Sequence, residues 1–373
     1  GRKGTVWVAV RIPDDAICAH ANQSRIRTFN QKDKKNVMFS KDCITFAREK
    51  GWFSGKDADF SFCEAYAYPD FSGRRFCEAR VWSFFNHFST DMERYLPYAE
   101  GKVKDAEPMP LWIKPNRKVS VQDIQECMRD HYEGTPFSLD KDPGQGVWNM
   151  PYRPTPLTYK VDGKEYFNER PTSTQQTAFS YVAQLRSWLP RQIGGVLWFG
   201  NDDGNMVAYT PVYCGNTSQP ECYNTKDADA VTFSMKNAFW VCNWVSNMVY
   251  PRYSLMFGSL KSVRDSLETS YFSAQAEIER KAMVLYDENP SLAIDFLTDY
   301  SIDKAQQMID RWRQLGTYLI VKYNDMAIKP DEDGRFIRTE TGLGATVERP
   351  GFPENVAREI VKSSGDRYAV PEE

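Results

Sequence analysis

The stretch that decides the fold class covers residues 194–212 and reads GGVLWFGNDDGNMVAYTPV. Its two flanks, residues 196–199 and 207–212, are rich in the aliphatic and aromatic residues that favour strands. Between them residues 201–205 (NDDGN) are of the types that favour turns. Two such runs around a turn predict an antiparallel β-hairpin.

Further strands are expected upstream of this hairpin. Residues 157–161 and 165–168 flank Asp162-Gly163, a strong signal for a tight hairpin turn. Residues 5–12 alternate in the manner of a strand, with Val6, Val8, Val10 and Ile12 on one face. With Arg2, Lys3 and Gly4 at a hairpin tip, this strand is predicted to be a second arm whose partner is not in the chain. Residues 16–21 are expected to continue as extended chain.

Helices are expected on both sides of these strands. The residues at 40–42 favour a cap for a short helix that stops at Gly51. Residues 74–87 have an apolar face at helical spacing. Ser120, with Asp123 three positions later, predicts a capped helix that runs to His131.

The second half of the sequence becomes mostly helical. Long apolar stripes cover residues 239–250, 255–286 and 303–323, with interruptions expected at Asn289-Pro290 and at Asp299-Tyr300. Beyond Lys329 an extended polar tail is expected. Strands enclosed by helices and followed by a helical run give an α+β protein, with domains predicted at 1–250 and 251–373.

Composition and charge exclude several classes of protein. The chain has 373 residues and a net charge of −3 with mixed signs, so it offers no basic field for nucleic acid. No apolar run approaches the ~20 residues of a membrane span. The eight cysteines include no CxxC pair and no histidine at zinc spacing, so neither a metal nor another cofactor is expected. The acidic runs at 202–204 and 331–334 lack the later glutamate of a calcium loop, and turns are expected there.

Cys214 and Cys222 give information on the cellular compartment of the protein. They bracket a polar loop at residues 215–221, which could close as a local disulfide in an oxidising compartment or stay reduced. We expect the pair to be bridged if the protein is exported, and a periplasmic or extracellular location is slightly favoured.

Several segments together resemble a known family, and they follow one another in that family's order. They are residues 10–15 (VRIPDD), 19–26 (AHANQSRI), 75–85 (RFCEARVWSFF), 128–137 (MRDHYEGTPF), 174–177 (TQQT), 194–200 (GGVLWFG) and 296–301 (FLTDYS). They resemble the bacterial cysteine dipeptidases of the amino-terminal-nucleophile (Ntn) hydrolase class, which are relatives of dipeptidase A and of the secernins.

This resemblance implies a fold and a chemistry. The fold would be part of a four-layer α-β-β-α Ntn sandwich with a helical carboxy-terminal extension. The nucleophile of such enzymes is a cysteine at the processed amino terminus, whose own α-amino group, with a pKa of about 8, acts as the base. Residue 1 here is Gly1, so the nucleophile is expected on a segment missing from this chain, and the chain alone is expected to be inactive.

The resemblance also implies site residues. Asn22 falls where related Ntn hydrolases place an asparagine that stabilises the tetrahedral oxyanion; a strand or turn amide is the alternative. Arg75, followed by Phe76, resembles the Arg-Phe pair that follows that asparagine at a similar distance. Its guanidinium would favour a thiolate or orient a substrate carboxylate. Arg80 competes for the same role, and a salt bridge to Glu78 or another acid is the alternative for these arginines.

A second constellation combines Cys18, His20 and Asn22. The period of two places these three side chains on one face of an extended strand. Same-face residues stand about 6.5–7 Å apart, however, and a nucleophile needs its base within hydrogen-bond reach. A self-contained cysteine protease site is therefore disfavoured. His87 and His131 are expected to be structural histidines.

Two function classes remain open at this stage. The first is a cysteine-type Ntn dipeptidase that acts on short peptides, completed by the missing amino-terminal segment. The second is a non-catalytic scaffold whose aromatic-rich cleft binds peptides or glycans; 14% of the residues are aromatic, which also suits ordinary core packing. The sequence leaves a homo-oligomer and the peptide specificity open.

Overall fold

The computed structural model describes residues 4–372, which form two compact units. Unit 1 contains the described residues up to Asp123 together with Leu157–Thr172. Unit 2 contains Ile124–Pro156 and the described residues from Ser173 onward. The predicted hairpin tip at residues 2–4 lies mostly outside the described residues, as does Gly1. The domain division predicted at residue 250 stays a prediction.

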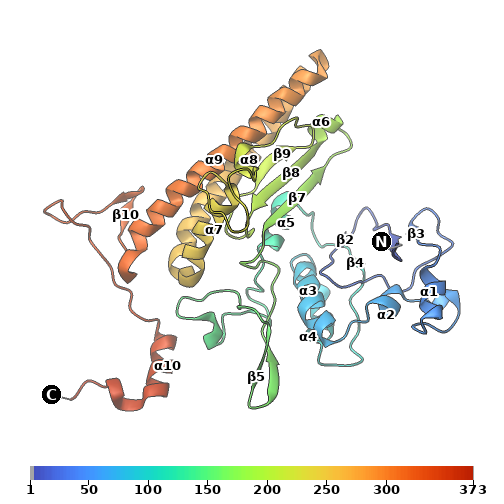
Figure 1. The fold of residues 1–373 in the computed structure, drawn as a ribbon, viewed down its shortest axis with the longest axis horizontal. Coiled ribbons are helices and arrows are strands. Elements are labelled where there is room, and N and C mark those ends of the chain that lie inside the picture. Colours follow the sequence, from blue (N-terminus) through green and yellow to red (C-terminus); the bar gives the residue numbers. More distant parts are fainter. Residues whose placement is uncertain (1–3, 373) are drawn as a thin grey trace. The chain divides into compact units, whose positions relative to one another are not determined.

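Unit 1 combines short helices with three two-stranded antiparallel sheets (Figure 1). The strand pairs are β1 (Val8–Val10) with β3 (Val37–Phe39), β2 (Ile17–Cys18) with β4 (Trp112–Ile113), and β5 (Thr158–Val161) with β6 (Lys164–Phe167). The helices are α1 (Cys43–Glu49), α2 (Phe62–Tyr66), α3 (Ala79–Asn86) and α4 (Leu96–Glu100), with a π-helical turn, η2 (Gly73–Glu78), directly before α3. Helix α5 (Val121–Met128) begins at the end of this unit.

The predicted hairpin around Asp162-Gly163 is confirmed. Both turn residues have positive φ, 50° and 77°, and Val161 pairs directly with Lys164. The helix predicted at 74–87 is also confirmed, although its first part is the π-helical turn. A capping box opens α5: Asp123 N donates to Ser120 Oγ at 3.1 Å, and Ser120 N donates to Asp123 Oδ2 at 2.7 Å.

Three expectations for unit 1 are wrong. The strand predicted at residues 5–12 is only β1, and its partner lies within the chain: it is β3, too short to be recognised from its sequence. The helix before Gly51 forms, but without a side-chain cap. Helix α5 ends at Met128 rather than at His131, because Tyr132 has a φ of 68° and donates its N–H to Asp130 Oδ1.

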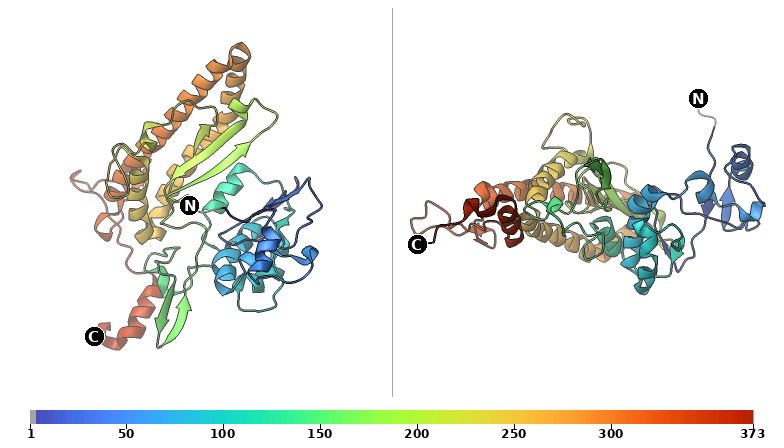
Figure 2. Two further views of the ribbon diagram at one scale, coloured as in Figure 1. Left: turned by 45° about the vertical axis from the view of Figure 1, so that its right-hand side comes forward. Right: turned by 90° about the horizontal axis from the view of Figure 1, so that it is seen from below.

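Unit 2 is a three-stranded antiparallel sheet packed against long helices (Figures 1 and 2). The sheet order is β7 (Phe179–Leu185), β8 (Gly195–Asn201), β9 (Thr210–Tyr213), so the hairpin predicted from residues 194–212 is confirmed. The remaining elements are α6 (Arg191–Gly194), α7 (Ala238–Val249), α8 (Tyr253–Glu288), α9 (Pro290–Tyr323), β10 (Asp331–Glu332), β11 (Arg335–Phe336) and α10 (Glu354–Ser364).

One face of this sheet packs on the helices. Trp198 of β8 stacks on Phe272 of α8, with 4.2 Å between ring centroids. Gln184 of β7 accepts a hydrogen bond from Gln275 of α8. Tyr213 of β9 lies edge-on to a tyrosine of α9. The core of unit 2 therefore lies between the sheet and the α8–α9 pair.

The helical run differs from the prediction at one place. Asn289 and Pro290 separate α8 from α9, as expected: Asn289 caps α9 through its side chain and Pro290 takes the first position, where a proline needs no N–H partner. Asp299-Tyr300 does not interrupt α9, because burial of Leu297, Thr298 and Ser301 on one side holds the helix through it. The tail beyond Lys329 is not simply extended, since it contains β10, β11 and α10.

The described residues form an α+β protein, as predicted. No helix among residues 4–372 combines the length and the apolarity that crossing a membrane requires.

Candidate functional site

The predicted site begins where the chain leaves β2. The extended segment ends before Asn22, which lies in a bend with a φ of 61°. Asparagine tolerates this left-handed conformation better than most residues. The side chain of Asn22 is exposed, and its next neighbour, Gln23, is buried. The side chain of Asn22 is thus exposed in a bend whose next residue is buried.

Because of this bend, Cys18, His20 and Asn22 do not share one face of a continuous strand. The predicted common strand face needs an extended chain through Asn22, and its positive φ breaks the alternation. Burial also raises the pKa of the Cys18 thiol, against a smaller opposing effect of Arg25, so the reactive thiolate is disfavoured. The prediction that this trio is no self-contained protease site fits both observations.

The second part of the site is the π-helical turn η2. Ala79 N donates to Arg74 O, five residues earlier, which is the π-helical spacing. Such turns occur frequently at functional sites. Gly73 opens the turn, and a Cβ added there would stand 2.6 Å from Gln23 Oε1, so η2 and the bend at Asn22 pack closely.

Arg75 lies buried on this turn. Its guanidinium forms an ion pair with Glu169 and lies over the ring of Phe167, 5.3 Å from the centroid. Both partners come from the end of β6 and the residues after it. Arg75 and Asn22 share no hydrogen bond, although the prediction assigns both to one site.

Asn22 instead contacts two other arginines of unit 1. Arg80 Nη2 lies 2.9 Å from Asn22 Oδ1, and Arg170 Nη1 lies 3.4 Å from the same oxygen. Because Glu169 pairs with Arg75 and the next residue, Arg170, contacts Asn22, the chain after β6 joins the two predicted site residues. The assignment of Asn22 and Arg75 to catalysis stays a prediction.

A buried ion pair lies next to Asn22 and η2 in the sequence. Arg25 Nε lies 2.9 Å from Glu78 Oε1, and both side chains are almost fully buried. Arg25 also donates to the carbonyl oxygens of Pro110 and Leu111. Burial raises the pKa of Glu78, while Arg25 acts in the opposite direction. This pair ties the segment after Asn22 to the last residue of η2.

Glu169 and Arg170 are the residues that the sequence reasoning missed. They lie far from Asn22 and Arg75 in sequence and belong to none of the matching segments. Their one signal is position, since two charged residues follow directly on a predicted strand whose aromatic end, Phe167, needs a packing partner.

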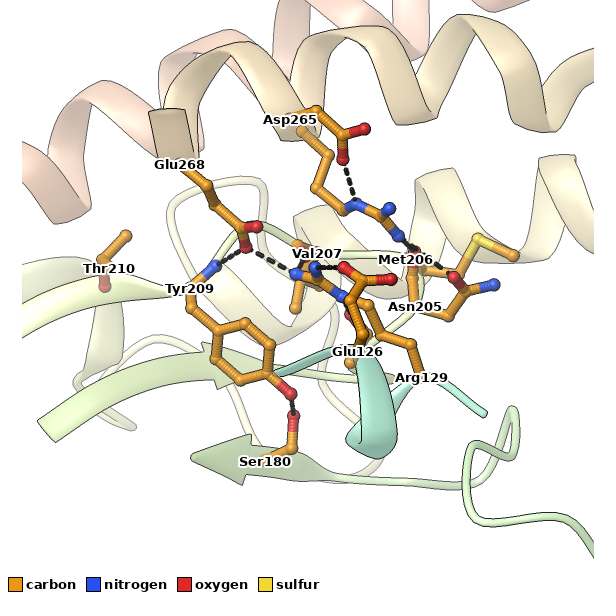
Figure 3. Close-up of polar contacts among 12 residues, drawn as sticks. Glu126, Arg129, Ser180, Asn205, Met206, Val207, Tyr209, Thr210, Asp265 and Glu268 are labelled. Atoms are coloured by element: carbon orange, nitrogen blue, oxygen red, sulfur yellow. Dashed lines mark hydrogen bonds and ion pairs between the residues drawn. The ribbon is translucent and has the colours of Figure 1, made fainter. Parts of the chain in front are cut away.

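A second polar cluster lies inside unit 2 (Figure 3). Arg129 pairs with Glu268 and donates to the carbonyl oxygen of Gly204, and Glu268 also accepts from Tyr209 N at 2.8 Å. Arg264 donates to both oxygens of Asn205. These groups are buried, and partners within the unit meet their charges, which is typical of a structural network.

Other predicted candidates are also structural. His131 is buried. Its Nδ1 lies 3.1 Å from Glu133 Oε1, and its Nε2 lies 3.4 Å from the hydroxyl oxygen of Tyr250. Asp202 and Asp203 form the predicted turn but are fully buried, and Asp202 accepts from Ser246 Oγ at 2.8 Å. Within residues 4–372 no group of three or more metal-ligating side chains comes together. Cys214 and Cys222 are both free thiols, so the disulfide expected for an exported protein is not formed here.

The comparisons with known proteins bear on residues of both units. Peptidase family C69 matches residues 2–266, well over half of the chain. The chain belongs to peptidase family C69. Its C69 region includes Asn22, η2, and the residues after β6.

Curated relatives carry dipeptidase names. The chain is 28% identical over 212 residues, 57% of its length and 43% of the relative's, to a probable dipeptidase of Salmonella dublin. It is 25% identical over 299 residues (79% and 55%) to a probable dipeptidase of Latilactobacillus sakei. It is 24% identical over 238 residues (64% and 44%) to dipeptidase A of Lactobacillus helveticus. This C69 chain thus spans about half the length of the curated relatives it matches.

Proposed function

We propose that the protein containing this chain is a cysteine-type dipeptidase that cleaves short peptides by acyl transfer to a thiol. The observation that carries the proposal is Asn22: its side chain is exposed, and among residues 4–372 its Nδ2 has no hydrogen-bond partner. A preorganised donor of this kind suits the charge that develops on a carbonyl oxygen in the transition state. Membership of a peptidase family and the names of the relatives support the same reaction class.

The proposed reaction uses an amino-terminal cysteine outside the described residues. Its α-amino group takes the thiol proton, and the sulfur attacks the peptide carbonyl carbon. Asn22 Nδ2 donates to the resulting oxyanion. The intermediate collapses to a thioester as the leaving amine receives the proton, and water then hydrolyses the thioester. Arg75, fixed by Glu169 and Phe167, supplies positive charge near the thiol or the substrate carboxylate.

The open face of the sheet in unit 2 supports the finer fold proposal, a four-layer α-β-β-α sandwich. Opposite the helices, β7 exposes Phe179, Tyr181 and Leu185 by 54%, 52% and 77%. Leu197 and Phe199 of β8 lie on the same face. Antiparallel sheets usually turn polar side chains to water, whereas an apolar outer face suits a second sheet packed about 10 Å away. The helical extension after this core belongs to the same proposal.

The test uses the whole protein with Asn22→Ala and Asn22→Asp. Aspartate keeps the shape and the acceptor that faces Arg80 and Arg170, but it has no N–H to donate. Both variants should lower kcat for dipeptide hydrolysis by about 10²–10³ with KM nearly unchanged. Thermal stability should stay nearly unchanged in Asn22→Asp and fall slightly in Asn22→Ala, because alanine accepts the positive φ less well. Unchanged kcat/KM in both variants would remove Asn22 from the reaction.

The second candidate function is a non-catalytic peptide- or glycan-binding scaffold. It is favoured by a cavity of about 710 Å³ in unit 1, which Phe29, Met109 and Trp112 help to line. Absence of dipeptide turnover by the whole protein, together with calorimetric binding of peptides or oligosaccharides that Trp112→Ala abolishes, would select this function. In the first candidate function, the proposed substrates are short peptides.

A further inference from the structure

We propose that Arg80 and Arg170 are positioning residues that fix which way the carboxamide of Asn22 points. This inference rests on the proposed role of Asn22 at the oxyanion. It adds the reason why the carboxamide presents its N–H groups, rather than its oxygen, to a substrate.

The orientation follows from the chemistry of the partners. A guanidinium has five N–H donors and no acceptor, so the Asn22 atom that faces it must be the carbonyl oxygen. Arg80 Nη2 and Arg170 Nη1 approach this atom at 2.9 and 3.4 Å. A flipped carboxamide would place its NH₂ group against two cations. The Nδ2 group is therefore directed away from both arginines.

The two arginines reach Asn22 from separate elements. Arg80 lies near the start of α3, directly after η2, and its side chain is itself fixed, since Nε donates to Phe76 O at 2.8 Å. Its Nη2 also lies 3.4 Å from Ala21 O, the carbonyl just before Asn22. Arg170 arrives from the chain after β6, where Glu169 is tied to Arg75. The exposed side chain of Asn22 is thereby held by two arginines from separate elements.

The contacts also strengthen the proposed donor. Hydrogen bonds from a charged group are roughly twice as strong as neutral ones, and bonds in a chain polarise one another. The positive charge of the guanidinium groups beside the carbonyl oxygen draws electron density from Nδ2, which makes the N–H groups of Asn22 better donors to an oxyanion. Loss of Arg80 should therefore lower kcat rather than weaken substrate binding.

A double-mutant cycle on the whole protein tests this inference. Arg80→Met should lower kcat by about 10- to 100-fold with KM within about twofold, and Arg170→Met should have a smaller effect in the same direction. In an Asn22→Ala background, Arg80→Met should change kcat by less than about threefold, because the group it positions is already gone. Arg94→Met, which breaks an exposed ion pair with Glu107, is the matched control and should leave kcat unchanged.

The outcomes separate the inference from the function on which it rests. If Asn22→Ala lowers kcat but Arg80→Met lowers it by the same factor in both backgrounds, the positioning role is wrong and the oxyanion role stands. If Asn22→Ala has no effect on kcat, both are wrong. Should Arg80→Met fail to fold, Arg80→Lys takes its place in the cycle, since it retains one donor and should show the same coupling at a smaller size.

Discussion

The molecule uses arginine in two ways, in the network inside unit 2 and around Asn22 in unit 1. In unit 2, Arg129 and Arg264 are buried. Arg129 pairs with the buried carboxylate of Glu268, and both arginines donate to main-chain carbonyl oxygens. Figure 3 shows this network. Around Asn22, two arginines converge on the oxygen of an exposed amide whose nitrogen remains available. The same residue type therefore stabilises the fold where its partners are buried, and in the proposed function it orients the side chain of Asn22 where that side chain is exposed.

The largest effect on stability is expected in the arginine network inside unit 2. Arg129→Met should lower the free energy of unfolding by about 3–5 kcal/mol, because it leaves the buried carboxylate of Glu268 without its cation. Urea unfolding of the whole protein measures this. The exposed Arg94→Met variant should change stability by less than about 1 kcal/mol. A similar small loss for Arg129→Met would contradict the structural assignment.

A second large effect concerns Asp202, which belongs to the buried interior of unit 2. Burial raises its pKa to about 7, against hydrogen bonds from Ser246 and Asn243 that lower it. The folded protein keeps the proton that the unfolded chain loses near pH 4. This contribution to stability is therefore complete below about pH 4 and is lost as pH rises through 7.

Asp202→Asn removes this pH dependence because the side chain stays neutral. Relative to the variant, the wild type should lose stability between pH 4 and 7, by an amount on the order of 4 kcal/mol. Unfolding free energies of both proteins across this range give the difference, and Asp287→Asn on the exposed surface of α8 is the matched control. A constant difference across this range would show that Asp202 is ionised in the fold.

A smaller effect is expected at Arg75, the cation beside the proposed site. Arg75→Lys should lower kcat/KM by about tenfold, because an ammonium cannot reproduce the planar contacts with Glu169 and Phe167 together. Steady-state kinetics on dipeptides measure this, with Arg94→Lys as the control. Full activity in Arg75→Lys would place Arg75 with the structural arginines of unit 2.

The smallest effect concerns the two thiols of the predicted disulfide. Cys214 is exposed, whereas Cys222 is buried and burial raises its pKa to about 11. Alkylation of the native protein at pH 8 should therefore modify Cys214 much faster than Cys222, as mass spectrometry of the peptides would show. Recovery of a Cys214–Cys222 bridged peptide would contradict the free thiols.

Local patterns predicted the elements that depend on local chemistry. Asp162-Gly163 specified its hairpin because few other residue pairs accept two positive φ angles in succession. Asn289-Pro290 specified a helix boundary for a similar reason, since a side-chain cap and a missing N–H act within one turn. Asp299-Tyr300 misled, because long-range burial of neighbouring residues in α9 outweighs the local preference.

The site was harder to predict because it, too, depends on contacts between residues that are far apart in the sequence. The resemblance supplied Asn22 and Arg75, which lie 53 positions apart in sequence. The contact of Asn22 with Arg170 joins residues 148 positions apart and depends on the packing of Phe167, at the end of β6, against Phe76 of η2. Nothing in the spacing of polar residues indicates such a contact. The positive φ of Asn22 was also invisible in a segment that otherwise alternates as a strand.

The most direct test of the central claim measures affinity for a mimic of the tetrahedral state. An α-amino aldehyde, whose aldehyde carbon replaces the scissile carbonyl of the first residue of a dipeptide, forms a tetrahedral adduct with a catalytic thiol and places an oxygen where the oxyanion develops. Inhibition of the whole protein by this aldehyde should weaken by about 10²–10³ in Asn22→Asp, while KM for the matching dipeptide stays unchanged. Equal inhibition of the wild type and Asn22→Asp would contradict the claim that Asn22 stabilises the oxyanion.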